Sequence, residues 1–165
     1  MRLWLAVALV VIFSACEVAD ESDAEPPAGV ECQWAEVRSI TDGDTVRVDL
    51  EGGEDDQPVR YIGIDTPEKE GSPDGPEPFG DEATARNAEL VKSERVCLER
   101  DVSETDRYGR LLRYVWLEDQ RLVNLLLVEE GLAEAVEFRP DVKRQDDLDA
   151  AEERAKKANL GIWSE

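Results

Sequence analysis

The order of short β-branched runs constrains the fold of this chain more than any other feature. Three such runs, at residues 33–40, 45–50 and 59–64, precede the first helical segment, and two more, at residues 96–98 and 111–117, follow it. Five short strands in this order favour a closed or nearly closed barrel with a helix inserted after the third strand. We therefore expect an α+β domain built on a five-stranded β-barrel.

Three segments have a composition typical of helices: residues 81–95, 122–132 and about 142–159. Gly131 and Asn159 provide stop signals for the second and third segments. Residues 67–80, between the third strand and the first helix, are rich in proline and glycine and predict a surface loop. The expected domain therefore combines five strands with three α-helices.

The first 15 residues, MRLWLAVALVVIFSA, have the layout of a signal peptide. One arginine precedes an apolar run that is too short to span a bilayer, and small residues follow. Cys16 comes next, and this junction resembles the bacterial lipobox, where the cysteine is acylated and becomes the mature N-terminus. We expect an exported cell-envelope lipoprotein, facing the periplasm or the surface, that contacts the membrane only through its lipid anchor. Ordinary cleavage after Ala15, which would give a secreted protein, is the alternative.

Residues 16–31 separate this signal from the domain. Six acids and two prolines fall within residues 17–31, with few side chains to bury. Such a composition favours a solvated, disordered tether. We therefore place the folded domain at residues 32–165.

Composition limits the chemistry of the domain. The chain has no histidine and only three cysteines, which excludes catalytic Ser-His-Asp triads, His-ligated zinc and four-thiolate zinc sites. Its formal net charge of −21 argues against a tight, non-specific grip on nucleic acid, because phosphate neutralisation supplies most of that affinity. Weak binding and turnover of one phosphodiester remain compatible with this charge. The available groups are carboxylates, arginines, hydroxyls and oxygen ligands for a hard cation.

Two motifs place acids where a cation site is expected. In Thr41-Asp-Gly-Asp-Thr45, strand parity puts Asp44 on the same face as the inward valines of the second strand, at the barrel's mouth. In the run from Arg60 to Glu68, Asp65 follows the last strand residue, and Pro67 holds Thr66 extended. The carboxylates of Asp44 and Asp65 and the Thr66 carbonyl form a partial oxygen cage for calcium.

The same motifs, with Asp106-Arg-Tyr-Gly-Arg110, supply groups for phosphodiester hydrolysis. Glu68 lies three residues after Asp65 and is a candidate general base for water. Arg60 and Arg110 are candidate phosphate ligands, because a guanidinium matches phosphate geometry and stabilises charge in the transition state. Each motif alone also fits a turn, a helix start or a loop closure, so the prediction depends on their combination.

In this order the motifs resemble the thermonuclease family over about residues 32–164. The segments that carry the resemblance are ITDGDTV, VRYIGIDTPE, PFGDEA, DRYGRLLRYVWL, LVNLLLVEEGLA and AKKANLGIWSE. It implies an OB-fold barrel with three α-helices and a calcium-dependent endonuclease acting on DNA and RNA. By resemblance, Asp44, Asp65 and the Thr66 carbonyl bind calcium, and Asp42 is an acid next to these ligands that does not itself bind the ion. The resemblance also implies that the catalytic residues are Arg60, Glu68 and Arg110. It places Arg107 and Tyr108 beside the substrate's terminal phosphate. Glu137 and Phe138 stand where the family has tyrosines beside the nucleotide base.

The resemblance also addresses the cysteines. If Cys16 is acylated and the domain is exported, Cys32 and Cys97 remain as one pair in an oxidising compartment. By family register they lie on the first and fourth strands, which are neighbours in the barrel. We expect a disulfide between them, with two buried free thiols as the alternative.

The leading function is therefore a calcium-dependent nuclease that acts as a monomer on single- or double-stranded DNA and RNA, with no obligate protein partner. One alternative is a non-catalytic OB-fold module that binds nucleic acid or protein on a lipid anchor. Another is an acidic, cation-buffering surface protein, which has no need for arginine at positions 60 and 110.

Overall fold

A computed structural model describes residues 24–164. The predicted signal peptide at residues 1–15, the predicted acylation site Cys16 and the first half of the tether lie outside the described residues. None of the helices in the described part combines the length and apolar character needed to cross a bilayer.

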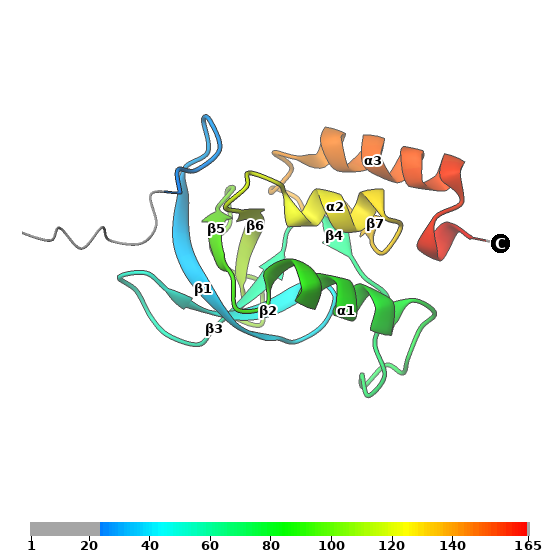
Figure 1. Ribbon diagram of the computed structural model, residues 1–165, viewed down its shortest axis with the longest axis horizontal. Helices are drawn as coiled ribbons and strands as arrows, with labels where there is room; N and C mark the ends of the chain where they lie inside the picture. The colour runs from blue at the N-terminus through cyan, green and yellow to red at the C-terminus, as the bar shows by residue number, and fades with distance from the viewer. Residues whose placement is uncertain (1–23, 165) are drawn as a thin grey trace, which may run out of the picture.

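Five strands close into a barrel, as the sequence predicts (Figure 1). They are β1 (Cys32–Ile40), β2 (Thr45–Leu50), β3 (Gln57–Tyr61), β5 (Arg95–Glu99) and β6 (Leu111–Leu117). Around the barrel they run in the order β1-β2-β3-β6-β5, and only β3 and β6 are parallel. This architecture confirms the predicted α+β class and the five-stranded OB-fold barrel.

The long strand β1 closes the barrel by pairing with two neighbours. Its second half pairs with β2 and its first half pairs with β5, and the register shifts between Val37 and Ser39. Such a bulge increases the local twist that a strand needs to turn around a closed barrel. Val46 and Val48 of β2 are fully buried inside, which confirms the inward face expected from strand parity.

The helices gather on one side of the barrel (Figure 1). Helix α2 (Val123–Glu129) lies between α1 (Gly80–Val91) and α3 (Gln145–Ala158). A two-stranded sheet of β4 (Ile64–Asp65) and β7 (Glu134–Ala135) joins the loop after β3 to the segment after α2, and the 3-10 turn η1 (Gly161–Trp163) follows α3.

All three helices are shorter than predicted. Helix α1 ends at Val91 because Ser93 has a positive φ of 62° and turns the chain into β5. Helix α2 ends at Glu129, and Gly131 follows with a φ of 71°. A Cβ at Gly131 would lie 2.3 Å from the Leu160 carbonyl oxygen, so both the conformation and the space require glycine. Helix α3 begins at Gln145, because the preceding residues from Val142 form a turn.

The predicted third strand at residues 59–64 is interrupted. Strand β3 ends at Tyr61, the chain turns at Ile62 and Gly63, and β4 resumes at Ile64. Gly63 has a φ of 79°, which an extended strand does not accommodate. Strand β7, the partner of β4, was not predicted. The predicted third strand is therefore two strands, and Asp65, which was expected to follow it, is the last residue of β4.

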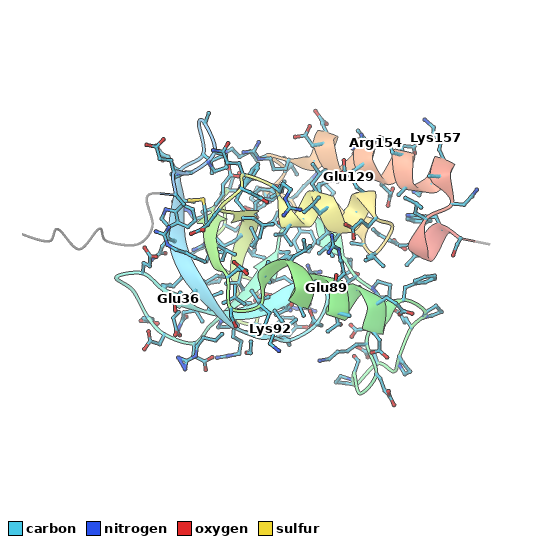
Figure 2. All side chains as sticks on the ribbon, viewed as in Figure 1. Glu36, Glu89, Lys92, Glu129, Arg154 and Lys157 are labelled. Carbon is cyan, nitrogen blue, oxygen red and sulfur yellow. A yellow bond between two sulfur atoms is a disulfide. The ribbon has the colours of Figure 1, made fainter. Side chains whose placement is uncertain are left out.

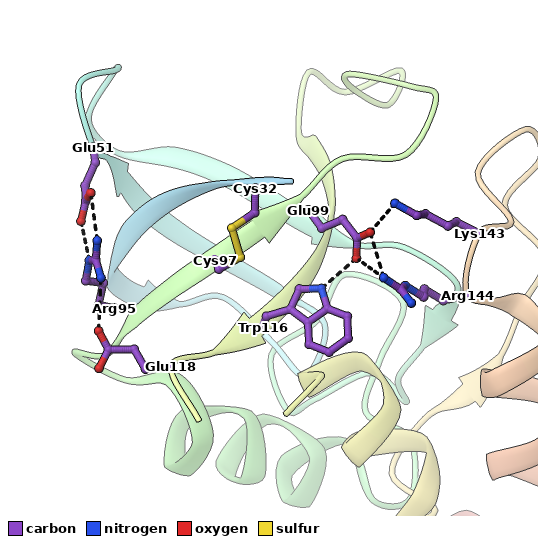
Figure 3. Close-up of a disulfide and its surroundings, with 9 residues drawn as sticks. All are labelled: Cys32, Glu51, Arg95, Cys97, Glu99, Trp116, Glu118, Lys143 and Arg144. Carbon is purple, nitrogen blue, oxygen red and sulfur yellow. Dashed lines mark hydrogen bonds and ion pairs between the residues drawn. A yellow bond between two sulfur atoms is a disulfide. The ribbon is translucent and has the colours of Figure 1, made fainter. Parts of the chain in front are cut away.

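The predicted disulfide between Cys32 and Cys97 is present and joins the start of β1 to β5 (Figure 3). Beside it, the carboxylate of Glu99 is fully buried and accepts hydrogen bonds from Trp116 Nε1 at 2.8 Å and Arg144 Nη2 at 3.0 Å (Figure 3). Lys143 also pairs with this carboxylate. Burial raises the pKa of Glu99, but these three donors outweigh it and hold the pKa below its usual value.

Charged side chains cover the outer surfaces of the strands and helices (Figure 2). Glu36 on β1 and Glu89 on α1 are both exposed. Arg154 of α3 pairs with Glu129 of α2 at 2.6 Å and links these two helices. Exposed pairs of this kind stabilise a fold only slightly, so the apolar core carries most of its stability.

Candidate active site

A polar pocket of about 180 Å³ lies at the mouth of the barrel. It brings together all six residues predicted to act in catalysis or calcium binding. Asp42, the acid predicted to lie beside the calcium ligands, also lines the pocket. The lining residues are Asp42, Asp44, Arg60, Asp65, Thr66, Pro67, Glu68 and Arg110.

Asp44 is buried at the start of β2, with 6% of its surface exposed. Its Oδ2 accepts hydrogen bonds from the Thr66 amide at 3.0 Å and the Thr66 hydroxyl at 3.2 Å, and its Oδ1 accepts one from Thr45 Oγ1 at 3.1 Å. The preceding turn is tight, because a Cβ at Gly43 would lie 2.6 Å from Thr66 Oγ1. The glycine of Asp-Gly-Asp therefore lets the Asp44 and Thr66 segments meet.

Arg60 is also only 6% exposed and is aimed at two carboxylates. Its Nη2 lies 2.6 Å from Asp65 Oδ1 and 3.2 Å from Asp44 Oδ2. Its Nη1 donates to the Tyr61 and Ile64 carbonyls, both at 2.8 Å, and so spans the turn between β3 and β4. These bonds hold a buried guanidinium in one orientation, which explains its place on an otherwise apolar strand face.

Arg110 reaches the pocket from the loop between β5 and β6. Asp106 organises this loop: its Oδ2 accepts a hydrogen bond from Arg110 Nε at 2.7 Å, and its Oδ1 accepts the Tyr108 and Arg110 amides at 2.8 and 3.0 Å. Burial raises the pKa of Asp106, but the bonds from Arg110 outweigh it and lower the pKa. Asp106 therefore positions Arg110 as a charged acceptor.

Arg107 and Tyr108 lie on the same loop but are not part of the pocket's lining. Tyr108 is 68% exposed, and the Arg107 guanidinium carbon lies 4.7 Å from the centre of its ring. Arg110 lies over the same ring at 5.5 Å. An exposed aromatic ring beside two guanidiniums presents both a stacking surface and positive charge next to the pocket.

The pocket holds more acids than bases. Burial and repulsion from Asp44 raise the pKa of Asp42 to about 6. Burial also raises the pKa of Asp65; Arg60 opposes this shift, whereas the nearby Asp44 and Glu68 add to it. A cation in this pocket would relieve the repulsion among these acids.

The donor atoms fit a hard cation. Between residues 24 and 164, no three side chains of Asp, Glu, His or Cys are grouped closely enough to hold a metal by themselves. The pocket instead offers the carboxylates of Asp44 and Asp65 and the backbone of Thr66, all oxygen ligands of the kind calcium prefers. Such an incomplete set leaves the remaining ligand positions to water or a substrate phosphate.

Asn87 supports the pocket and was missed by the sequence analysis. It is fully buried on α1, accepts a hydrogen bond from the Tyr61 hydroxyl at 2.9 Å and donates to the Asp42 carbonyl at 2.9 Å. These two hydrogen bonds link the barrel core to the turn that carries Asp44. The sequence does carry a sign of this role, because the polar Asn87 lies on the apolar face of the helix, in line with Ala83 and Leu90.

Phe138 also lies beside the site, with its ring centre 5.3 Å from the Arg60 guanidinium carbon. The exposed Glu137 precedes it and pairs with Arg139. Phe138, which differs from the tyrosine that the resemblance implies at this position, therefore lies beside the pocket's buried arginine.

The chain is similar in sequence to several known proteins. The model of the family described as "Staphylococcal nuclease homologue" matches residues 58–165. The thermonuclease of Staphylococcus hyicus is 38% identical over 98% of this chain and 95% of its own length, and that of Staphylococcus intermedius is 36% identical over 98% and 94%. Endonuclease YncB of Bacillus subtilis is 42% identical over 74% of this chain and 58% of its own length. On this similarity, and with the closed barrel and three helices in place, the chain belongs to the staphylococcal nuclease family.

Proposed function

We propose that this protein is a calcium-dependent nuclease that hydrolyses phosphodiester bonds of DNA and RNA at the cell envelope. Nuclease activity follows from the family, because two thermonucleases match nearly the whole chain and an endonuclease matches most of it. Calcium dependence, the roles of the individual residues and anchoring are our assignments.

One observation carries the assignment of the site: two arginines, two calcium-type carboxylates and Glu68 line the same pocket. Arg60 comes from strand β3, and Arg110 comes from the loop before β6. Two guanidiniums from separate elements suit a phosphate bound between them. Neither the binding-module nor the cation-buffering alternative requires this convergence.

The mechanism follows from these positions. Asp44, Asp65 and the Thr66 carbonyl would hold calcium, which supplies positive charge at the reacting phosphate. Glu68 takes a proton from the water that attacks phosphorus. Arg60 and Arg110 donate hydrogen bonds to the phosphate oxygens as their negative charge grows. The water oxygen bonds to phosphorus as the bond to the leaving oxygen breaks and the strand is cut; the leaving oxygen takes a proton from solvent, and Glu68 returns its proton to solvent.

The surroundings of the pocket fit a substrate that is bound weakly and released. Arg107 and Tyr108 stand on the rim beside Arg110 and would contact a neighbouring phosphate or base. The net charge of −21 opposes accumulation of nucleic acid over the rest of the surface. We propose that the protein acts as a monomer on single- or double-stranded substrates.

The Glu68→Gln variant tests the role of the base. We expect its turnover to fall by about 10²- to 10⁴-fold, the usual contribution of a positioned base, with calcium affinity little changed. Glu70→Gln is the matched control, because Glu70 is an exposed acid of the same loop outside the pocket lining. Full activity in Glu68→Gln would overturn the assigned mechanism.

We also propose that acylated Cys16 holds the domain at the membrane through an acidic tether. Mass spectrometry of the native protein should find a diacylglyceryl group on an N-terminal Cys16. A Cys16→Ser protein should leave the membrane fraction. An unmodified terminus, or an unchanged distribution of Cys16→Ser, would contradict the anchor.

A further inference from the structure

The loop between β4 and α1 holds Glu68 at three of its own atoms. The hydroxyl of Ser72 donates a hydrogen bond to Glu68 Oε2 at 2.5 Å. The Glu68 amide donates to Glu77 Oε2 at 2.9 Å, and the Glu77 amide donates back to the Glu68 carbonyl at 2.8 Å. The backbone of Glu68 is therefore fixed by Glu77, and its side chain is fixed by Ser72.

This arrangement rests on helix α1. A Cβ at Gly80, the first residue of α1, would lie 2.1 Å from the Glu68 carbonyl oxygen, so helix and loop are in close backbone contact. The Glu70 amide also donates to Asp81 Oδ1 of the first helical turn at 3.0 Å. Although the loop is exposed, the segment that carries Glu68 is built against a rigid element.

The side chain of Glu68 needs such a restraint. Glu68 and Asp65 both line the pocket, and the repulsion between their like charges acts against holding the Glu68 carboxylate there. A glutamate side chain also has several accessible rotamers. The Ser72 bond selects one of them and occupies only Oε2. No hydrogen bond within residues 24–164 ends on Oε1, which stays available for a water molecule.

We propose that Ser72 is the positioning residue of the general base: its hydroxyl holds the Glu68 carboxylate at the pocket so that the free oxygen meets the attacking water. Ser72 does not touch the reacting atoms and acts only through Glu68. This inference rests on the role proposed for Glu68. It adds a residue that stands outside the motifs in the sequence and outside the pocket lining.

The test compares Ser72→Ala and Ser72→Thr with Ser39→Ala, an exposed serine on β1 far from this loop in sequence. Ser72→Ala should lower kcat about 10-fold with KM and calcium affinity nearly unchanged, because misplacing a catalytic group slows the chemical step. Ser72→Thr, which keeps the hydroxyl, should restore kcat. Ser39→Ala should match the parent protein.

A second readout uses the metal-free protein. With ¹³C-labelled glutamate carboxyls, Ser72→Ala should move the one NMR signal that is missing in Glu68→Gln and leave the other glutamate signals in place. In the Glu68→Gln background, Ser72→Ala should cause no further loss of kcat, because no base remains to be positioned.

The role of Ser72 would be overturned if Ser72→Ala kept full kcat, if Ser72→Thr failed to restore kcat, or if the Glu68 signal did not move. It would also be overturned if Ser72→Ala lowered kcat as much in the Glu68→Gln background as in the parent protein. These outcomes leave the proposed nuclease mechanism standing if Glu68→Gln itself is impaired. Full activity in Glu68→Gln would instead remove the mechanism on which this inference depends.

Discussion

Reducing the disulfide between Cys32 and Cys97 should destabilise the domain strongly. The bond joins residues 65 positions apart and so restricts the unfolded chain over about half of the domain. For a loop of this length, the chain-entropy relation gives about 4 kcal/mol of lost unfolding free energy. The Cα atoms lie 5.5 Å apart, within the usual span for a disulfide, so the native fold accommodates the bond.

Urea unfolding measures this effect. A chain that begins after the signal peptide and carries Cys16→Ser keeps only this cysteine pair. With a slope of roughly 2 kcal/mol per molar urea, reduction should move the unfolding midpoint down by about 2 M. Cys32→Ala is the control: its midpoint should match the reduced parent and should not respond to reductant. A loss below about 1 kcal/mol, or a response of Cys32→Ala to reductant, would refute the reasoning.

Three further predictions concern the pocket and the buried carboxylate. Asp44→Asn should weaken calcium binding, measured by calorimetry, because one anionic ligand is lost; unchanged affinity would exclude Asp44 as a ligand. Arg110→Ala should reduce kcat more than substrate affinity in steady-state kinetics, because its hydrogen bond strengthens as charge develops; a larger loss of affinity than of kcat would contradict this role. Glu99 has a lowered pKa in the folded state, so its contribution to stability is present above the unfolded pKa near 4.5 and is lost as pH falls through the folded pKa. The unfolding free energy of Glu99→Gln should therefore depend less steeply on pH in the acid range than that of the parent, by a slope that corresponds to the binding of at most one proton on unfolding. Equal slopes would contradict the assignment.

Local patterns were sufficient to predict most of the barrel and most of the pocket. Alternation along β2 placed Asp44 beside two inward valines, and the structure buries all three. Asp65 was predicted to follow a strand; it is instead the last residue of the short strand β4, and it lines the pocket beside Thr66 as expected. The prediction for Asp44 succeeded because side-chain direction in a strand depends only on the parity of neighbouring residues.

Features that depend on contacts between distant segments could not be predicted. After the break that follows Tyr61, β4 pairs with β7, whose residues lie about 70 positions further along the chain. No local pattern in the sequence identifies β7 as the partner of β4. The hydrogen bond between Asn87 and the Asp42 carbonyl is similarly remote in sequence. The Ser72–Glu68 bond is local, but it depends on the course of a loop rich in proline and glycine, which has no periodic signal.

A nucleic-acid zymogram with controlled calcium tests the central claim most directly. Lanes of the parent protein and of Glu68→Gln would be developed in calcium, in calcium with excess chelator, and after calcium is restored to the chelated gel. The proposed mechanism predicts clearing by the parent only where calcium is free, recovery when calcium returns, and little clearing by Glu68→Gln in any lane. Clearing that persists in chelator, or equal clearing by Glu68→Gln, would contradict it.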